Sequence, residues 1–214
     1  MISLFLDTSG QMMTIAIFKG KKPLHILQEE SNKDLSVKLL PKIKEIIEEL
    51  QLYVTDIDKI FVVNGPGSFT GIRIGLTVAK VLAWALNIPI IPISALEFLA
   101  TTNGTKYIAP MIDARRDAVY AGLYTSDLKT IIKDSYILRE EFVKKIKEYE
   151  RDVTFVSMDT FASLHTISPK VNLTKIIEKY IDSVGVEVHT LIPNYLKKTE
   201  AEEKRNDTFL SNEG

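Results

Sequence analysis

The sequence predicts an α/β fold of two related lobes, each with the element order β-β-β-α-β-α. Three observations support this prediction. Short β-prone runs are followed by amphipathic stretches in both halves of the 214-residue chain. A glycine-rich turn at residues 64–75 joins an apolar strand to an apolar helix. An apolar strand that ends in an aspartate occurs near the start, at Asp7, and again past the middle, at Asp113.

The first lobe is expected to begin with three strands, because apolar β-prone runs alternate there with turns that contain glycine or proline. A helix follows in which apolar residues recur three or four positions apart and charged residues fill the remaining surface. Another strand leads into the glycine-rich turn, and the helix after it is apolar on nearly every side. The expected elements are strands Ile2–Leu6, Met12–Phe18, Leu24–Gln28 and Ile57–Val63 and helices Leu35–Leu52 and Gly71–Leu86.

The first lobe is expected to end with a short buried strand, Pro89–Ile93, and a short helix, Ala95–Ala100. Ser94 is the expected cap of this helix, because a serine side chain can accept a hydrogen bond from a free backbone N–H group. Glu97 stands at the third helical position, as in a capping box.

A polar turn at residues 101–104 marks a boundary, so we expect lobes at residues 1–103 and 104–214. Two such lobes form the actin-like (ASKHA, RNase H-like) architecture, in which an acid at the first hairpin of each lobe faces nucleotide phosphates across a cleft. The charged tail Lys197–Gly214 is expected to fray into disorder. The repeat comprises strands Tyr107–Ile112, Val119–Tyr124, Ile131–Leu138 and Val153–Ser157 and helices Glu140–Tyr149 and Leu173–Ile181.

Composition excludes several classes of site. There is no cysteine, so the chain has no disulfides, thiolate metal sites or cysteine nucleophiles. The formal net charge of -1 gives no general reason to expect nucleic-acid affinity. The first strand reaches Asp7 too soon for a signal peptide, and no uncharged apolar stretch approaches the ~20 residues that cross a bilayer. We therefore expect a cytoplasmic protein without membrane contact.

The glycine-rich turn, Asn64 to Gly75, has two interpretations. It can offer backbone N–H groups to an anion, because the first N–H groups of a helix lack partners within that helix. It can also be a tight packing joint, because glycine lets the chain pass close to another surface. The turn matches neither a Walker-type phosphate loop nor Gly-x-Gly-x-x-Gly. Ser68 or Thr70 is the expected N-cap, and Gly67, Ser68 and Thr70 are the candidate anion-contacting residues.

Small residues recur at every fourth position of the following helix, at Gly71, Gly75, Ala79 and Ala83. They form one stripe along which another element can approach closely, and larger apolar residues cover most of the remaining surface. Two interpretations remain open. The helix lies in the core between the sheet and a neighbouring element, or it joins the Leu35–Leu52 helix in presenting an apolar face to a partner protein.

The polar candidates are also ambiguous. Asp7 could hold a metal–phosphate complex, or it could accept backbone hydrogen bonds within its own turn. Arg115 and Arg116 could clamp a phosphate or a carboxylate, or they could lie in solvent. No histidines stand at metal-ligand spacing, no Ser-His-Asp set can be assembled and no acid pair stands out. The sequence therefore predicts no catalytic residues and no metal ligands.

Several segments together resemble the TsaB (YeaZ) family. The likeness covers most of the chain in the same order, and the glycine segment is its most specific part. The resemblance implies the two-lobed actin-like fold and a role beside TsaD and TsaE, which install threonylcarbamoyl on the adenosine next to the anticodon of tRNAs that read codons beginning with A. The segments are Asp7-Thr8-Ser9, Leu39-Leu40-Pro41, residues 65–75, residues 112–116 and Pro193-Asn194-Tyr195-Leu196.

The resemblance also distinguishes a catalytic subunit from an accessory one. TsaD-type catalytic subunits hold a metal with a His-x-x-x-His pair just after the strand that follows the glycine-loop helix, and the corresponding positions here are Ala95 and Leu99. A methyl and an isobutyl group cannot coordinate a cation, so the resemblance implies a non-catalytic subunit. One departure is Leu35, because the family often has histidine at that position.

In the TsaB family the two helices of the first lobe pair with TsaD, and the same surface self-associates when the protein is alone. The resemblance thus favours the partner-face interpretation, with TsaD and TsaE as partners, a homodimer in their absence and tRNA contacted only through the complex. It implies no tightly bound cofactor, and ATP or ADP only in the assembled complex. A charged residue at Ala79 is expected to abolish complex formation without unfolding the chain. The expected partner-contacting residues are Leu39, Ile43, Ile46, Gly71, Gly75, Leu76, Ala79, Leu82 and Ala83.

The alternative is an enzyme that acts on its own, either an actin-fold small-molecule phosphotransferase or a glycoprotease-like metal hydrolase. Such an enzyme needs a competent phosphate or metal site. Tight binding of ATP with Mg²⁺, or of Zn²⁺ or Fe²⁺, by the isolated chain would favour this alternative.

Overall fold

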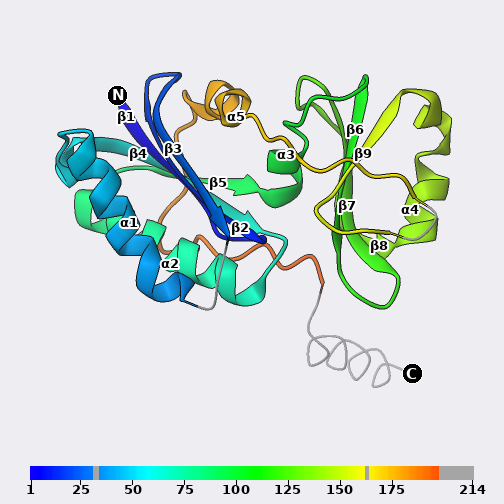
Figure 1. Ribbon diagram of the computed structural model, residues 1–214, viewed down its shortest axis with the longest axis horizontal. Helices are drawn as coiled ribbons and strands as arrows, with labels where there is room; N and C mark the ends of the chain where they lie inside the picture. Colours follow the sequence, from blue (N-terminus) through cyan, green and yellow to red (C-terminus); the bar gives the residue numbers. More distant parts are fainter. Residues whose placement is uncertain (31–33, 162–163, 198–214) are drawn as a thin grey trace, which may run out of the picture.

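The computed structural model describes residues 1–30, 34–161 and 164–197, and within them two β-sheets lie side by side (Figure 1). The described strands form a five-stranded sheet of order β3-β2-β1-β4-β5 and a four-stranded sheet of order β8-β7-β6-β9. The first sheet comprises β1 (Ile2–Asp7), β2 (Met12–Lys19), β3 (Lys22–Glu30), β4 (Ile57–Gly65) and β5 (Ile90–Ser94). The second comprises β6 (Tyr107–Asp113), β7 (Ala118–Thr125), β8 (Thr130–Leu138) and β9 (Val153–Val156). The helices are α1 (Leu35–Glu49), α2 (Phe69–Leu86), α3 (Ala95–Leu99), α4 (Arg139–Lys145) and α5 (Leu173–Tyr180), with 3-10 turns at Val54–Asp56 and Lys147–Asp152.

Both sheets are built in the same way. In the first sheet β1 pairs antiparallel with β2, β2 antiparallel with β3, and β1 parallel with β4. In the second sheet β6, β7 and β8 repeat the antiparallel order and β9 runs parallel to β6. A parallel pair needs a crossover, which α1 supplies in the first repeat and α4 in the second. This common topology confirms the predicted two-lobed α/β fold.

Helices α1 and α2 cover one face of the first sheet (Figure 1). Leu39, Ile43 and Ile46 of α1 are at most 2% exposed and belong to the same buried cluster as Leu4 and Ile15 of the sheet. Fully burying one such side chain contributes about 1.5–3 kcal/mol. The apolar periodicity of α1 therefore serves this lobe's own core.

The other face of the first sheet carries a core that both lobes share. Phe5 and Phe61 of the first sheet belong to one buried cluster with Ile108 and Val156 of the second sheet. Phe98 of α3 is part of the same cluster, and its ring centroid lies 5.1 Å from that of Phe5. Figure 1 shows α3 between the two sheets. The lobes are thus joined by an apolar core.

Helix α5 follows the second sheet in sequence but lies against the first sheet, on the face opposite α1 and α2 (Figure 1). The chain just after α5 is held there, because the buried Lys59 Nζ on β4 donates to the carbonyl oxygens of Ile181 at 2.6 Å and Ser183 at 2.7 Å. The chain then passes the edge strand β5 and reaches α2, where Leu191 joins the core under α1 and α2. The expected boundary at residues 103/104 therefore separates the two sheets, but residues 173–197 return to pack on the first.

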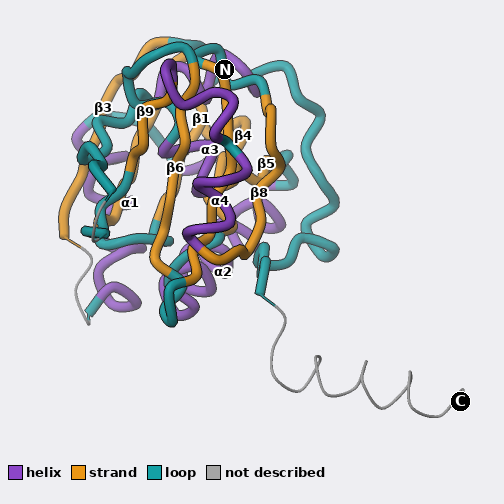
Figure 2. The backbone as a smooth tube through the Cα atoms, turned by 90° about the vertical axis from the view of Figure 1, so that its right-hand side faces the viewer, coloured by secondary structure: helices purple, strands orange, loops and turns teal. Residues whose placement is uncertain are grey.

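Helix α4 covers the outer face of the second sheet, away from the first lobe (Figure 2). Phe142 and Ile146 are almost fully buried there and cluster with Met111, Val119 and Leu123 of the sheet. The second sheet thus has a smaller core of its own in addition to the shared one.

Two predicted helix ends require correction. Helix α1 ends at Glu49 rather than Leu52, and Gln51 just beyond it has a positive φ of 56°, which a helix cannot accommodate. The helix expected at Glu140–Tyr149 is α-helical only to Lys145 and is followed by a 3-10 turn. The other boundaries agree with the sequence to within a few residues.

The cap of α3 is partly as predicted. Ser94 Oγ accepts hydrogen bonds from the backbone N–H groups of Leu96 at 3.1 Å and Glu97 at 3.4 Å, which confirms the serine cap. The capping box is wrong, because the Glu97 carboxylate instead bonds Lys179 and Tyr180 of α5.

Within the described ranges, α2 is by length and composition the one helix that is long and apolar enough to cross a membrane. Its buried side packs on the first sheet, with Leu76 and Ala79 at most 3% exposed, as expected of a core helix. The predicted disorder of the tail concerns Lys197–Gly214, and of these residues 198–214 lie outside the described part of the chain.

Candidate functional site

A cleft of about 1350 Å³ lies between the lobes. Its walls come from the ends of β1 and β6, the glycine-rich turn before α2, and α3. The structure therefore brings residues of both repeats to one place. All the candidate anion-contacting residues line the cleft, namely Asp7, Gly67, Ser68, Thr70 and Arg115.

The glycine-rich turn is a tight packing joint against the turn after β1. A Cβ atom on Gly67 would lie 2.2 Å from the carbonyl oxygen of Ser9, and one on Gly71 would lie 2.0 Å from that of Thr8. A Cβ atom on Gly75 would lie 2.2 Å from Thr8 Oγ1. Backbone atoms cannot move aside as a flexible side chain can, so Gly67 and Gly71 require glycine. At Gly75 the obstacle is a side-chain hydroxyl, which is held in place by its hydrogen bond to the Gly71 carbonyl oxygen. The small-residue stripe of α2 thus faces the first sheet and its hairpin.

Hydrogen bonds close the same joint. The Ser68 N–H donates to the carbonyl oxygen of Ser9 at 2.7 Å, and the Gly71 N–H donates to Ser68 Oγ at 3.2 Å. Ser68 is therefore the N-cap of α2, as predicted for Ser68 or Thr70. Two of the N–H groups that an anion could have used are already paired within the chain.

The Asp7 carboxylate accepts hydrogen bonds within its own turn. Its Oδ1 accepts from the Ser9 N–H at 2.8 Å and from Ser9 Oγ at 2.7 Å. Burial raises the pKa of the Asp7 carboxyl, and the two bonds from Ser9 oppose that shift. Asp113 repeats the arrangement in the second lobe, where its Oδ1 accepts from the Arg115 N–H at 3.0 Å. The two strand-ending aspartates are thus structurally equivalent, although Asp113 is exposed.

The turn after β6 has an unusual backbone. Arg115, Arg116 and Asp117 have consecutive positive φ angles of 65°, 54° and 59°. Left-handed backbone is uncommon for residues other than glycine. This turn directs Arg115, an exposed residue, to the edge of the cleft, where its side chain could meet an anion or remain in water.

The cleft wall at α3 is apolar where the catalytic relatives were expected to carry metal ligands. Ala95 and Leu99 both line the cleft. Among the described residues, no group of three or more His, Cys, Asp or Glu side chains could hold a metal ion. Neither residue at these two positions can donate an electron pair to a cation.

Most of the residues predicted to contact a partner are buried against this chain's own first sheet. Leu39, Ile43 and Ile46 face the first sheet, and Leu82 is half-buried beside them. Gly71, Gly75, Leu76, Ala79 and Ala83 are buried as well. The expectation for a charged residue at Ala79 is corrected too, because this side chain is 0% exposed and a charge there would disrupt the fold.

The outer side of α2 is made of different residues. Phe69, Arg73, Thr77 and Val81 are exposed at every fourth position, followed by Trp84. This stripe is offset by two residues from the buried small stripe, which places it on the opposite side of the helix. The same periodicity defines this second stripe in the sequence, but only the structure shows which of the two stripes is exposed. Helix α1 adds exposed apolar side chains at Val37 and Leu40.

One surface cluster could not have been found from the sequence. The Arg73 guanidinium lies 3.8 Å from the ring centroid of Phe69, and Arg73 Nε donates to Tyr195 Oη at 2.9 Å. The rings of Phe69 and Tyr195 stack with centroids 5.5 Å apart. Tyr195 comes from the returning C-terminal segment, so only the tertiary structure places it beside α2.

Known proteins are similar to this chain in sequence. A family model described as "TsaD: tRNA N6-adenosine threonylcarbamoyltransferase" matches residues 25–208. The chain is 33% identical to the tRNA threonylcarbamoyladenosine biosynthesis protein TsaB of Bacillus subtilis (strain 168), over 95% of this chain and 97% of that protein. It is 32% identical to the TsaB protein of Escherichia coli (strain K12), over 58% of this chain and 55% of that protein.

Solved structures share the fold. YeaZ from Pseudomonas aeruginosa aligns with a TM-score of 0.73 and 25% identity, covering 91% of this chain and 99% of that one. A second structure, described as an uncharacterized protein with similarity to peptidase YEAZ from the same organism, aligns with a TM-score of 0.78 and 25% identity, covering 92% and 99%. The similarity in sequence and in fold thus extends over nearly the whole chain.

Proposed function

Because this chain belongs to the TsaB (YeaZ) family of tRNA threonylcarbamoyladenosine biosynthesis proteins, we propose that it is the accessory, non-catalytic subunit of a tRNA-modifying complex. In this role it binds and activates a TsaD-type catalytic subunit, together with TsaE. The complex transfers threonylcarbamoyl to the adenosine next to the anticodon of tRNAs that read codons beginning with A. In this proposal the protein is cytoplasmic and contacts tRNA only through the complex.

The observation that carries this proposal is the exposed apolar face of α1 and α2. Val37 is 72% exposed and Leu40 52% on α1, and Val81 is 58% and Trp84 66% on α2. Both helices turn their other side to the first sheet, so this face has no cover within the described part of the chain. Large exposed apolar side chains that lie together are typical of protein–protein contacts, and tryptophan is enriched among the residues that dominate them.

The energy of such a contact can be bounded. Fully burying one of these side chains contributes about 1.5–3 kcal/mol, whereas association costs roughly 4–15 kcal/mol in lost freedom. Four side chains that are 52–72% exposed can offset on their own only the lower part of that cost range. A stable complex therefore needs a partner that brings a comparable apolar face, which a pair of helices from a related lobe supplies. The same reasoning supports a homodimer when the catalytic subunit is absent.

The cleft supports the accessory role. Ala95 and Leu99 stand where the family resemblance implies the metal ligands of a TsaD-type catalytic subunit, and the carbonyl groups of Thr8 and Ser9 pack into the glycine-rich turn. This chain's own residues thus form a structural joint where a phosphate-binding loop was the alternative. We propose that ATP or ADP enters only in the assembled complex and that no cofactor is held tightly by the chain alone.

The test is co-purification of the chain with a TsaD protein from the same source. Trp84→Asp places a charge in the centre of the proposed contact and is expected to abolish co-purification while leaving the circular dichroism spectrum unchanged. Light scattering should show the same variant losing any homodimer formed by the parent chain. The matched control is Val184→Asp, because Val184 is 91% exposed and comes soon after α5, the helix that lies on the other face of the first sheet (Figure 1). A Trp84→Asp chain that co-purifies at the parental yield would place the interface elsewhere.

A further inference from the structure

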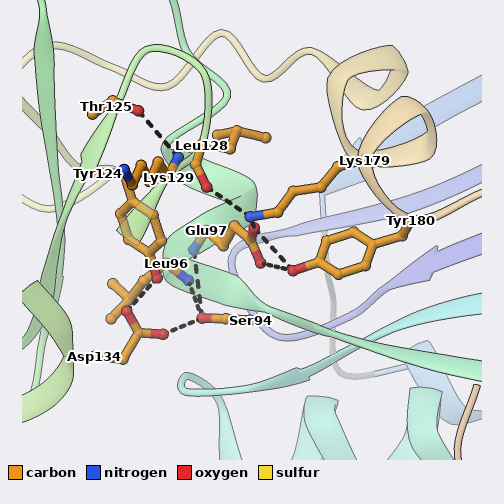
Figure 3. Close-up of polar contacts among 10 residues, drawn as sticks. All are labelled: Ser94, Leu96, Glu97, Tyr124, Thr125, Leu128, Lys129, Asp134, Lys179 and Tyr180. Carbon is orange, nitrogen blue, oxygen red and sulfur yellow. Dashed lines mark hydrogen bonds and ion pairs between the residues drawn. The ribbon is translucent and has the colours of Figure 1, made fainter. Parts of the chain in front are cut away.

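A connected set of partly buried polar side chains crosses from the first lobe to the β7–β8 hairpin of the second (Figure 3). We call it the interlobe clasp. It has two branches, one through Ser94 and one through Lys179, and both reach the same hairpin. Its members are Ser94 and Glu97 at the N-cap and in the middle of α3, Tyr124 and Asp134 of β7 and β8, the Leu128 carbonyl oxygen, and Lys179 and Tyr180 of α5.

The first branch starts at the N-cap of α3. Ser94 Oγ accepts from two backbone N–H groups of α3 and donates its own proton to Asp134 Oδ2. Asp134 Oδ1 accepts from Tyr124 Oη. Burial and the nearby Asp134 carboxylate raise the pKa of Tyr124, so the phenol keeps the proton that it donates. One carboxylate thus ties both strands of the hairpin to α3.

The second branch starts in the middle of α3. The Glu97 side chain is 8% exposed and bonds Lys179 Nζ and, at 2.8 Å, Tyr180 Oη. Lys179 Nζ also donates to the Leu128 carbonyl oxygen at 2.6 Å. Leu128 lies in the turn between β7 and β8, so a single ammonium group joins α3, α5 and the tip of the same hairpin.

The hairpin is shaped to accept this contact. A Cβ atom on Gly122 would lie 2.5 Å from Asp134 Oδ1, so glycine at this position leaves room for the carboxylate. Leu128 has a positive φ of 60° and is 2% exposed, which turns its carbonyl group toward Lys179 while burying its side chain in the shared core. A polar network whose members are all satisfied rigidifies a structure and specifies one arrangement of the parts that it joins.

We propose that the interlobe clasp fixes the opening of the cleft by anchoring the β7–β8 hairpin to α3 and α5 at two points. Ala95 and Leu99 of α3 line one wall of the cleft, and Tyr120 of β7 lines another, so any rotation between the lobes must break one or both branches. The chain is then a rigid support, whereas two lobes joined only by apolar packing could rock about the cleft. This inference concerns the isolated chain and does not depend on the proposed partner.

The test measures the distance between the lobes in the full chain. The chain has no cysteine, so Lys44→Cys on α1 and Glu141→Cys on α4 carry one spin label each without background labelling. In the parent, pulsed electron–electron double resonance between the two spin labels is expected to give one narrow distance distribution. Asp134→Ala with Lys179→Met removes both branches and is expected to broaden this distribution and to reduce amide-exchange protection in α3.

The control makes the same chemical changes in the same hairpin. Asp127→Ala with Lys129→Met alters two exposed residues of the β7–β8 turn and is expected to leave the distribution as in the parent. If Asp134→Ala with Lys179→Met folds by circular dichroism and keeps the parental distribution, or if the control broadens it equally, the proposal is overturned. Should that double variant fail to fold, Ser94→Gly with Lys179→Met replaces it, because glycine is tolerated at an N-cap yet cannot bond Asp134, and methionine cannot bond the Leu128 carbonyl oxygen. A broadened distribution in Ser94→Gly with Lys179→Met supports the proposal, and an unchanged one overturns it.

Discussion

Thr8 and Gly71 join the first hairpin to the start of α2. Thr8 Oγ1 donates to the Gly71 carbonyl oxygen at 2.7 Å, and the Thr8 carbonyl oxygen occupies the space where a Cβ atom of residue 71 would lie. The contact links residues that are far apart in sequence and sets the position of α2 on the sheet. It therefore also positions the apolar face through which we propose that the chain binds its partner.

Gly71→Ala is expected to lower the free energy of unfolding by about 1–3 kcal/mol, the typical cost of forcing extra atoms into a packed core. The backbone carbonyl of Thr8 must shift to admit the methyl group, and α2 must move with it. Urea denaturation measures the loss. Gly10→Ala is the matched control, because a Cβ atom there would meet nothing within 4 Å. Equal stability of the two variants would contradict the packing-joint interpretation.

Glu97→Gln is expected to destabilise the chain by about 1–3 kcal/mol. Removing one partner of a fully buried ion pair typically costs about 3–5 kcal/mol, and the estimate is lower here because the Lys179 side chain is 33% exposed. Thermal and urea unfolding measure the effect. Glu178→Gln alters an exposed glutamate on α5, and we expect it to change stability by less than about 0.5 kcal/mol. A Glu97→Gln chain as stable as this control would show that the ion pair adds nothing net.

Asp7→Asn is expected to change how stability depends on pH. The pKa of Asp7 is raised by burial above its ordinary value of 3.8, so the folded chain binds this proton more tightly than the unfolded chain. The stability that this group contributes is therefore fully present below pH 3.8 and is lost as the pH rises through the raised pKa. Asparagine is always neutral and can still accept from Ser9.

Melting temperatures of the parent and Asp7→Asn between pH 4 and pH 8 provide the measurement. The variant should gain relative to the parent as the pH rises, by about 1.4 kcal/mol for each unit by which the pKa is raised. Asp113→Asn is the control, because the equivalent carboxylate in the second lobe is exposed. A difference in melting temperature between the parent and Asp7→Asn that stays constant with pH would show that burial does not raise the pKa of Asp7.

Isothermal titration of the isolated chain with ATP and Mg²⁺ is expected to show no tight, saturable binding. The glycine-rich turn is filled by its own hairpin, and the cations at the cleft, Arg115, Lys170 and Lys197, are spread around its wall rather than gathered on a phosphate-binding loop. Titrations with Zn²⁺ and Fe²⁺ should give the same result. Submicromolar binding of either kind would revive the alternative of an independent enzyme.

The candidate site was only partly predictable. The sequence brought Asp7, the glycine-rich turn and Arg115 forward as candidates, and the structure places all of them around one cleft. It could not decide between an anion site and a packing joint, because the distance between Gly71 and Thr8 depends on how the hairpin folds over α2. The residues predicted to contact a partner are mostly buried within the chain itself, since apolar periodicity shows that a helix has a buried face but not what covers it.

Local chemistry determined the order of strands and helices, the repeated aspartate turns, the serine caps of α2 and α3 and, through residue types at Ala95 and Leu99, the absence of metal ligands there. These features depend on neighbours within a few positions, so the sequence alone was sufficient. Only the tertiary structure decided that α5 crosses back to the first sheet, that Glu97 pairs with Lys179 and that the stripe containing Trp84 is the one left exposed. Such contacts join segments that are far apart in sequence, so they depend on how the whole chain packs and not on local preferences.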